Sequence, residues 1–385
     1  MIILAAPNAF KGSLTADQAA QAMAEGISRV DHDIQVICVP VSDGGDGLII
    51  AMANAIDAQT CTINVRGPRL THVDANYLFD QSKSTAVIEM ALASGLALLS
   101  QDLCDPTLTT TLGTGDLIVD ALDRGAKHIF MGIGGSATCD GGMGVAAALG
   151  YEFLDKQGNP LPPVGDSMIK VEAIDATGID QRLSDTSFSV ACDVINPFCG
   201  PDGASFVFCP QKGATPAQVK ALDEGLKNLK RVIFKDLGVD LGPVQGAGAA
   251  GGLGGGMKAF FNAELCPGID LVLDVLNFGE KVKTADLVLT AEGQIDNQTC
   301  FNKAPAGVAK AAKKAGIPCI GLCGSQGKGI DSLYVLGMDA VISICNGPMP
   351  LDTAMTEAKH LLSMASEQVV RTYLAGRKSL WDKKK

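Results

Sequence analysis

The chain has 385 residues, of which 47% are hydrophobic and 19% are charged, so it has enough apolar material for one large or two ordinary domains. Its 31 basic and 42 acidic residues give a formal net charge of −11, which argues against binding to nucleic acid or to an anionic membrane surface. The sequence has no apolar run near the ~18 residues of a spanning helix, and its first residues lack the basic flank of a signal peptide. The composition therefore predicts a soluble, cytoplasmic protein.

The twelve cysteines and four histidines limit the kinds of catalytic mechanism that the chain could use. The cysteines include no CxxC pair and mostly stand beside apolar residues, which is typical of reduced thiols in a core. The histidines lie near no nucleophile or acidic motif of recognisable spacing, so a Ser-His-Asp mechanism has little support. We expect any chemistry to use carboxylates, lysines and the backbone of glycine-rich loops.

Strand–loop–helix units begin and end the chain. Residues 2–6 predict a strand, and Thr15 with Gln18 forms a capping box that opens a helix. A second unit follows, and the same pattern returns later; the further predicted strands are residues 34–39, 128–131, 286–290, 317–323 and 339–345. Successive units of this kind give parallel strands whose carboxyl ends meet at one sheet edge, where doubly wound proteins bind ligands.

Hairpin signals between these units predict a second domain. We expect residues 1–60, 107–150 and 281–385 to form a doubly wound, mostly parallel α/β domain. Residues 61–106 and 151–280 would form a second α/β domain, inserted discontinuously into the first.

Two glycine-rich loops could bind phosphate through their backbone N–H groups. The first, residues 132–142, follows a predicted strand and opens a helix; its candidates are Gly134, Gly135, Ser136, Gly141 and Gly142. The second, residues 241–256, contains a formal dinucleotide-binding pattern, but no clear strand precedes it. It is better interpreted as an anion-binding loop, with Gly248, Gly251 and Gly252 as candidates.

Carboxylates gather in the loops at the same predicted edge. They are Asp43, Asp46, Glu292 and Asp296, and such a group needs a cation or a proton to offset its charge; Mg²⁺ carried by a nucleotide would do so. Asp193 and Asn196 end another predicted strand and offer a base and an amide. Three lysines stand in glycine- or proline-flanked loops where an anionic substrate would bind: Lys11, Lys212 and Lys303.

These motifs, in this order, resemble the glycerate kinase family of the bacterial two-domain type. The matching stretches are residues 6–14 (APNAFKGSL), 42–47, 132–142, 191–197 (ACDVINP), 208–214 (FCPQKGA), 246–252, 291–299 and 303–305. The chain departs from the family pattern at Asn8-Ala9, where Asp-Ser is usual, and at Phe301-Asn302, where Gly-Gly is usual.

The resemblance implies a Rossmann-like domain joined to a second α/β domain, with the active site in the cleft between them. It implies ATP-dependent phosphorylation of D-glycerate, with 2-phosphoglycerate favoured over 3-phosphoglycerate, and therefore ATP and Mg²⁺ as cofactors. The proposed base is Asp193, with Asp43 as second choice. Other expected roles are Mg²⁺ binding by Asp43, Asp46, Glu292 and Asp296, substrate or phosphoryl binding by Lys11, Ser13, Asn196, Lys212 and Lys303, and nucleotide-phosphate binding by the glycine loops.

Two other interpretations stay open on the sequence. A dinucleotide-dependent dehydrogenase of a small hydroxy acid could use the turn from Gly132 to Ala137, with Glu152 or Asp155 holding the ribose. The other interpretation is a non-catalytic binding protein with two lobes. In such a protein the clustered carboxylates would have no function. The sequence leaves the oligomeric state open, and a homo-oligomer is compatible with it.

Overall fold

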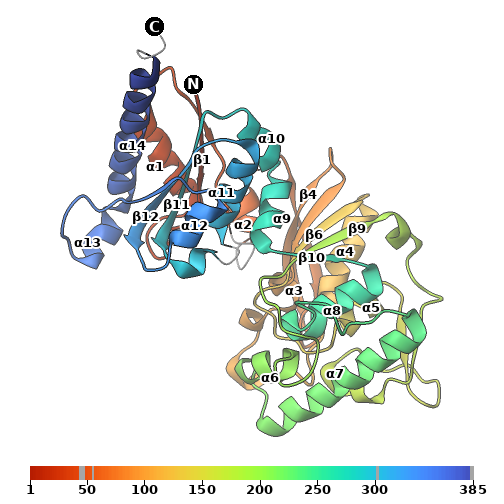
Figure 1. Ribbon diagram of the computed structural model, residues 1–385. Coiled ribbons are helices and arrows are strands. Elements are labelled where there is room, and N and C mark those ends of the chain that lie inside the picture. Colours follow the sequence, from red (N-terminus) through yellow and green to blue (C-terminus); the bar gives the residue numbers. More distant parts are fainter. Residues whose placement is uncertain (43–47, 54–55, 301–302, 382–385) are drawn as a thin grey trace. The chain divides into compact units, whose positions relative to one another are not determined.

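The computed structural model describes residues 1–42, 48–53, 56–300 and 303–381 (Figure 1). The chain divides into two compact units: unit 1 comprises Met1–Asp43, Asn54–Ile56 and Val272–Lys385, and unit 2 comprises Gly44–Ala53 and Asp57–Leu271. Each unit has its own sheet and its own apolar core. Among the described residues, no helix is both long and apolar enough to cross a membrane.

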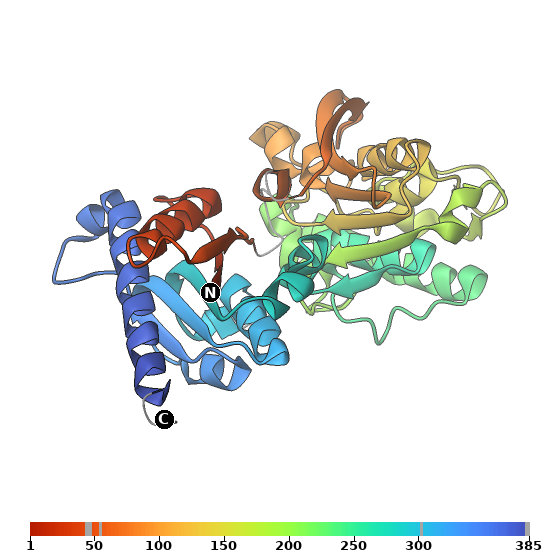
Figure 2. The same cartoon turned by 90° about the horizontal axis from the view of Figure 1, so that it is seen from above.

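Unit 1 is built on a five-stranded parallel sheet (Figures 1 and 2). In spatial order its strands are β13 (Ala340–Ser343), β12 (Cys319–Gln326), β11 (Leu287–Ile295), β1 (Ile2–Pro7) and β2 (Gln35–Cys38). The central strands β1 and β11 are buried along most of their length, as expected for parallel strands covered on both faces. Counted along the chain within this unit, the order is 2-1-3-4-5, a doubly wound, Rossmann-like arrangement that reverses between β1 and β11.

Helices cover both faces of this sheet. Helices α1 (Ala16–Ser28) and α14 (Ala358–Trp381) pack against each other and share one core with β1 and β11. Helices α11 (Ala304–Ala315) and α12 (Asp331–Leu336) lie on the other side, with α11 against β11 and β12 (Figure 1). The predicted capping box is confirmed, since the Gln18 amide donates to Thr15 Oγ1 at 3.2 Å and the Thr15 amide donates to Gln18 Oε1 at 2.9 Å. Short helices α10 (Phe278–Lys283) and α13 (Leu351–Thr356) complete the unit, and α9 (Gly268–Val275) crosses its boundary.

Unit 2 is built on a six-stranded mixed sheet. Its spatial order is β10 (Glu264–Cys266), β9 (Ser187–Ala191), β6 (His128–Gly132), β5 (Thr85–Glu89), β4 (His72–Asp80) and β3 (Gln59–Arg66). The first four strands are parallel, whereas β4 and β3 pair antiparallel. Its helices are α2 (Leu48–Ala53), α3 (Ala91–Ser94), α4 (Leu112–Asp123), α5 (Met143–Ala148), α6 (Ala204–Phe208), α7 (Pro216–Leu237) and α8 (Ala249–Phe261). Strands β7 (Glu152–Leu154) and β8 (Ala173–Asp175) form a separate two-stranded sheet.

The domain boundaries expected from the sequence require correction. Residues 48–53 and 57–60, expected in the first domain, belong to unit 2, and residues 272–280, expected in the second domain, belong to unit 1. Residues 107–150 belong to unit 2, because β6 pairs with β5 on one side and with β9 on the other. Their βα pattern resembles that of unit 1, but the strand pairing that decides the domain is a tertiary property. The expected active site between the two domains stays a prediction.

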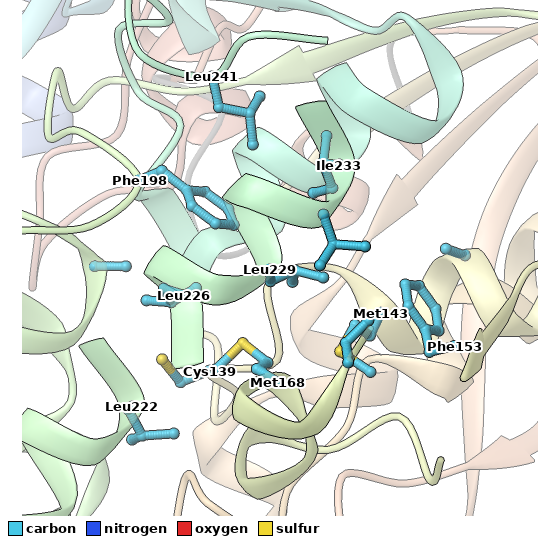
Figure 3. Packing of buried hydrophobic residues seen from close by; sticks show 14 of the residues in the cluster. Cys139, Met143, Phe153, Met168, Phe198, Leu222, Leu226, Leu229, Ile233 and Leu241 are labelled. Atoms are coloured by element: carbon cyan, nitrogen blue, oxygen red, sulfur yellow. The ribbon is translucent and has the colours of Figure 1, made fainter. Parts of the chain in front are cut away.

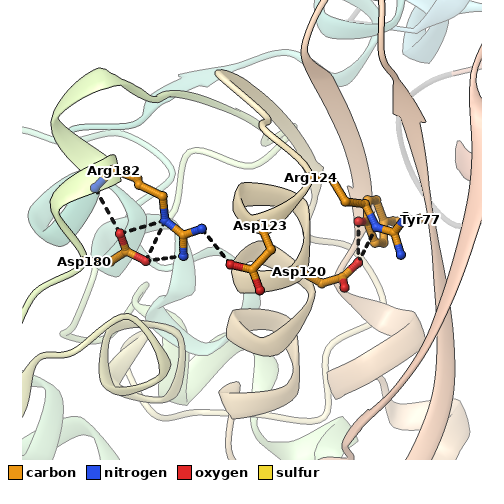
Figure 4. A network of polar contacts seen from close by, with 6 residues as sticks. All are labelled: Tyr77, Asp120, Asp123, Arg124, Asp180 and Arg182. Atoms are coloured by element: carbon orange, nitrogen blue, oxygen red, sulfur yellow. Dashed lines mark hydrogen bonds and ion pairs between the residues drawn. The ribbon is translucent and has the colours of Figure 1, made fainter.

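Charged groups on α4 tie this helix to neighbouring elements of unit 2 (Figure 4). Asp120 accepts hydrogen bonds from the Tyr77 hydroxyl on β4 at 2.6 Å and from Arg124 Nε at 2.8 Å. Asp123 accepts one from Arg182 Nη1, on the segment before β9, at 2.6 Å. Burial and the Asp120 contact raise the pKa of Tyr77, so it stays a neutral donor.

The core of unit 2 lies between α7, α8 and the segment around β7 (Figure 3). Phe198 is 1% exposed there, and its ring lies within van der Waals reach of the backbone around Gly252 and Gly255. Side chains on these glycines would meet the ring, so the aromatic group and the glycines are matched in size.

Replacing Phe198 with alanine should lower the free energy of unfolding of unit 2 by about 3–5 kcal/mol, because it leaves a cavity that the rigid loops cannot fill. Urea unfolding followed by circular dichroism measures the loss. The control is Phe234→Ala on α7, whose ring is 60% exposed and whose loss should be small. Equal shifts in the two variants would contradict the assignment of Phe198 to the core.

Candidate functional site

A pocket of about 540 Å³ opens at the carboxyl ends of the parallel strands of unit 1. This is the edge where the strand order reverses and where doubly wound sheets bind ligands. It is lined by the loop after β1, the carboxyl ends of β11 and β12, the start of α11, the loop after β13, α13 and the start of α14. Its lining residues are Ala9, Phe10, Lys11, Ser13, Glu292, Gly293, Gln294, Lys303, Gly324, Ser325, Ile344, Cys345, Met349, Leu351, Ala354, Met355 and Ala358.

The structure brings Lys11, Ser13, Glu292 and Lys303 together in this pocket; of these, the sequence analysis placed only Glu292 in the group of carboxylates expected at the sheet edge. Neither lysine forms an ion pair with another residue that the structure describes. Ser13 Oγ donates a hydrogen bond to the Met355 carbonyl at 2.5 Å, so this hydroxyl shapes the pocket by holding α13 to the loop after β1. The pocket therefore contains two cations and an ordered hydroxyl beside one carboxylate.

Glu292 is the carboxylate of the pocket wall and lies at the reversal point of the sheet. It is 7% exposed, and its Oε1 accepts a hydrogen bond from Asn8 Nδ2 at 3.4 Å. Asn8 is held in turn by its backbone N–H, which donates to the Ala291 carbonyl at 2.7 Å. Asn8 is thus a neutral partner that orients Glu292.

The other expected metal ligands are placed differently. Asp296 lies beyond the pocket lining, where its carboxylate accepts hydrogen bonds from the Gln298 amide at 2.8 Å and from Gln294 Nε2 at 2.9 Å. Asp43 and Asp46 lie outside the described residues. Within the part of the chain that the structure describes, no three acidic, histidine or cysteine side chains are grouped as a metal site. Mg²⁺ that arrives on phosphates needs only one or two protein carboxylates, and Glu292 fits that requirement.

A second group of polar residues lies at the carboxyl edge of the unit 2 sheet. Glu89 ends β5, Gly134 and Gly135 follow β6, and Asp193 follows β9. Asp193 is exposed, and its Oδ1 accepts a hydrogen bond from the Gly268 amide at 2.9 Å. Glu89 is 7% exposed and accepts one from the Ile49 amide at 3.4 Å. The sequence analysis missed Glu89, although an acidic residue at the end of the apolar run 85–88 was a usable signal.

Most glycines of the two loops have a packing role and not the expected phosphate-binding role. The N–H groups of Gly141, Gly142, Gly248 and Gly252 already donate inside the protein, and their acceptors are the Gly251 carbonyl, Asp140 Oδ1, the Asn196 carbonyl and the Gly248 carbonyl. Gly251 has a φ of +69°, and a Cβ there would lie 2.0 Å from the Thr138 carbonyl. The two loops therefore pack backbone to backbone, and among the candidate phosphate-binding glycines only Gly134 and Gly135 are exposed.

Asp140 organises the first loop, and the sequence analysis missed it. This carboxylate is fully buried and accepts four hydrogen bonds, from Thr111 N at 2.7 Å, Thr111 Oγ1 at 2.8 Å, Gly142 N at 3.1 Å and Gly144 N at 3.2 Å. Burial raises its pKa, while these donors act in the opposite direction. The position of Asp140 between glycines in the predicted loop was the available signal.

Lys212 is buried and holds the loop after β6 by hydrogen bonds. Its side chain does not reach solvent, as that of a substrate-binding residue would. It is 2% exposed, and its Nζ donates to Ser136 Oγ at 2.6 Å and to the Thr138 carbonyl at 2.7 Å. Burial lowers its pKa, and the neighbouring Cys209, Cys139 and Asp140 oppose that effect. Lys212 thus positions Ser136. Asn196 is also committed internally, since its Nδ2 donates to the Asp202 carbonyl at 2.8 Å.

The sequence of the whole chain identifies its relatives. The model of the glycerate kinase family matches residues 3–374. The chain belongs to the glycerate kinase family. It is therefore an enzyme, a kinase that transfers a phosphoryl group to an alcohol acceptor.

Individual members of the glycerate kinase family resemble the chain over nearly its full length. It is 44% identical to a glycerate kinase of Halalkalibacterium halodurans, over 95% of this chain and 97% of the relative. It is 43% identical to a glycerate 2-kinase of Escherichia coli, over 98% and 99% of the two chains. A crystal structure of a glycerate kinase 2 from Salmonella typhimurium LT2 is similar with a TM-score of 0.87 and 41% identity, covering 98% of this chain and 99% of that one.

The dehydrogenase interpretation fails on both sequence family and geometry. Strand β7, which contains Glu152, pairs antiparallel with β8 in a separate sheet. A ribose-binding carboxylate would stand at the end of the next parallel strand. The interpretation as a non-catalytic binding protein is excluded by membership in the glycerate kinase family.

Burial of Lys212 should make the free energy of unfolding depend on pH. Since the pKa of Lys212 is lowered in the folded state, the unfolded chain binds more protons between that lowered pKa and the ordinary value of 10.5. As pH rises through this window, the free energy of unfolding of the wild type should therefore increase relative to that of Lys212→Met. The increase is at most about 1.4 kcal/mol per pH unit. Urea unfolding from pH 7 to pH 10 measures the difference. The exposed Lys220→Met variant is the control, and parallel pH profiles for wild type and Lys212→Met would contradict the assignment.

Proposed function

We propose that this kinase transfers the γ-phosphoryl group of ATP to D-glycerate, with Mg²⁺ bound to the nucleotide and the 2-hydroxyl group as acceptor. The observation that carries the proposal is the near-full-length similarity to glycerate kinases, including the glycerate 2-kinase of Escherichia coli. The pocket with two lysines and a carboxylate in unit 1, and the exposed carboxylate at the sheet edge of unit 2, are groups that such a reaction requires.

Asp193 is the proposed general base. An alcohol is a weak nucleophile, and a carboxylate within reach can accept its proton as the new P–O bond forms. Asp193 is exposed directly after β9, and the hydrogen bond from Gly268 to Oδ1 orients its carboxylate. Asp43 is the second candidate for this role.

Anionic parts of the substrates need positive or N–H partners in both units. We assign Lys11 and Lys303 to the phosphoryl groups, because both line the pocket of unit 1 and lie at the carboxyl edge of its sheet. In unit 2 the exposed turn at Gly134 and Gly135 is the proposed anion-binding element, and the Lys212 ammonium behind Ser136 adds positive charge to it.

Mg²⁺ would be held by Glu292, with Asp46 and Asp296 as the further expected carboxylates. The ion would offset charge on the phosphate oxygens and fix their orientation. The chain's own contribution is to hold Glu292 in place through Asn8 and to keep it next to the two lysines.

We also infer that the enzyme works in the cytoplasm. All twelve of its cysteines are free, which suits a reducing compartment. The proposed partners are small molecules, ATP and glycerate. A homo-oligomer stays compatible with the chain.

The function is tested by incubating the purified protein with D-glycerate, ATP and Mg²⁺ and identifying the products by phosphorus NMR. We expect ADP and 2-phosphoglycerate in equal amounts. The appearance of 3-phosphoglycerate would overturn the choice of hydroxyl group, and the absence of ADP with every Mg²⁺ and glycerate concentration tried would overturn the proposed reaction.

Replacing Asp193 with asparagine tests the base. The variant keeps an oxygen that can accept the Gly268 hydrogen bond but loses the proton acceptor, so kcat should fall on the order of 10²-fold or more while KM for glycerate changes little. Steady-state kinetics measure both constants, and Asp202→Asn, an exposed change in a nearby loop, is the control. Near-normal turnover of a folded Asp193→Asn variant would move the role to Asp43, and a loss of glycerate binding alone would make Asp193 a substrate-positioning group.

A further inference from the structure

We propose that the pocket of unit 1 binds the nucleoside triphosphate itself, with the base and ribose against its apolar residues and the phosphates at its lysines. The inference rests on the proposed ATP-dependent function and adds which element of the fold receives the nucleotide. It replaces the expectation that the two glycine loops of unit 2 surround the nucleotide phosphates.

The first argument is size. A pocket of about 540 Å³ lies within the range of ~300–1,000 Å³ that is usual for cofactor and drug-sized ligands. Glycerate is a three-carbon acid that would fill a small part of this volume. A nucleotide, with a flat base, a sugar and a chain of phosphates, matches it.

The second argument is the chemistry of the apolar lining. The apolar residues that line the pocket include Ile344, Met349, Leu351, Ala354 and Met355. Leu351 is 73% exposed, and methionine side chains adapt well to the face of a planar ring. Glycerate is polar on every carbon and has no surface that would gain from contact with these residues. A purine base has one.

The third argument is the charge of the polar residues that line the pocket. Lys11 and Lys303 line the pocket with Glu292, and neither lysine has an ion-pair partner among the residues that the structure describes. A triphosphate carries enough negative charge to engage two ammonium groups and a carboxylate-bound Mg²⁺ together. A single carboxylate of glycerate would leave one lysine in excess.

The proposed base-binding and phosphate-binding residues are joined by one contact. Ser13, two residues after Lys11 on the loop that follows β1, donates to the carbonyl of Met355 on α13 at 2.5 Å. This hydrogen bond sets the distance between the apolar residues of α13 and the lysine. The glycine loops of unit 2 have fewer amides available to bind the nucleotide phosphates, because four of them already donate to acceptors within the protein.

The inference is tested by a substitution that places a larger side chain among the apolar residues of the pocket. Ala354 and Thr353 are neighbours on α13, but Ala354 is half-buried and lines the pocket, whereas Thr353 is exposed and does not. Ala354→Phe should weaken ATP binding at least about tenfold, because the ring occupies the volume of the base. Thr353→Phe, the matched control, should bind ATP as the wild type does. Isothermal titration calorimetry with ATP and circular dichroism for folding give the readouts.

Two probes separate the parts of the nucleotide. Inorganic tripolyphosphate lacks the base, so Ala354→Phe should leave its competition with ATP intact, whereas Lys303→Gln should weaken it. Met355→Ala removes part of the apolar lining without adding bulk and should also weaken ATP binding; this variant decides the matter if Ala354→Phe does not fold.

The outcomes distinguish this inference from the proposed function. Unchanged ATP binding in folded Ala354→Phe and Met355→Ala overturns the pocket assignment. Weakened glycerate binding with normal ATP binding overturns it as well and assigns the pocket to the acid. If wild-type protein binds ATP in this pocket but does not phosphorylate glycerate, the proposed acceptor fails while the nucleotide site stands.

Discussion

The parallel pairing of β1 with β11 is the contact on which the rest of the molecule depends. It sets Ile3 opposite Leu287 and Pro7 opposite Ala291, so it joins segments separated by 284 positions. All of unit 2 lies within the loop that this pairing closes. Closing a loop of that length costs entropy, and a compact insert with its own core limits that cost by shortening the flexible part of the loop.

The same pairing creates the candidate site of unit 1. The strand order reverses between β1 and β11, and the chain leaves both strands at one edge. Asn8, directly after β1, and Glu292, in β11, meet there because the register sets Pro7 opposite Ala291 and so places the next residues of the two segments side by side. Functional side chains that leave the ends of buried strands inherit the rigidity of the sheet, while the loops around them are free to vary. Asp193 after β9 is an equivalent case in unit 2.

In unit 2, buried polar groups hold the glycine-rich loops in place beside the apolar core. Asp140 and Lys212 are both out of solvent, and each compensates for its lost hydration by hydrogen bonds to the loop after β6. The glycines that let the two loops approach have their amides inside this network. A glycine-rich loop in a sequence is therefore ambiguous: the same absence of side chains allows a phosphate to approach or another backbone to pack.

The sequence by itself determined the α/β class, the capping box at Thr15, the strand–loop–helix units of both chain ends and the family, because these depend on local periodicity and on ordered motifs. It also indicated that Glu292 lies in a loop at the carboxyl edge of the sheet, and it named Lys11, Ser13 and Lys303 as binding candidates; the structure placed all four in one pocket. Only the tertiary structure decided that residues 107–150 join unit 2, that Lys212 is buried and that the amides of Gly141, Gly142, Gly248 and Gly252 are already engaged. Strand pairing, burial and hydrogen-bond partners arise from segments distant in sequence, and local patterns carry no information about which distant segment will supply them.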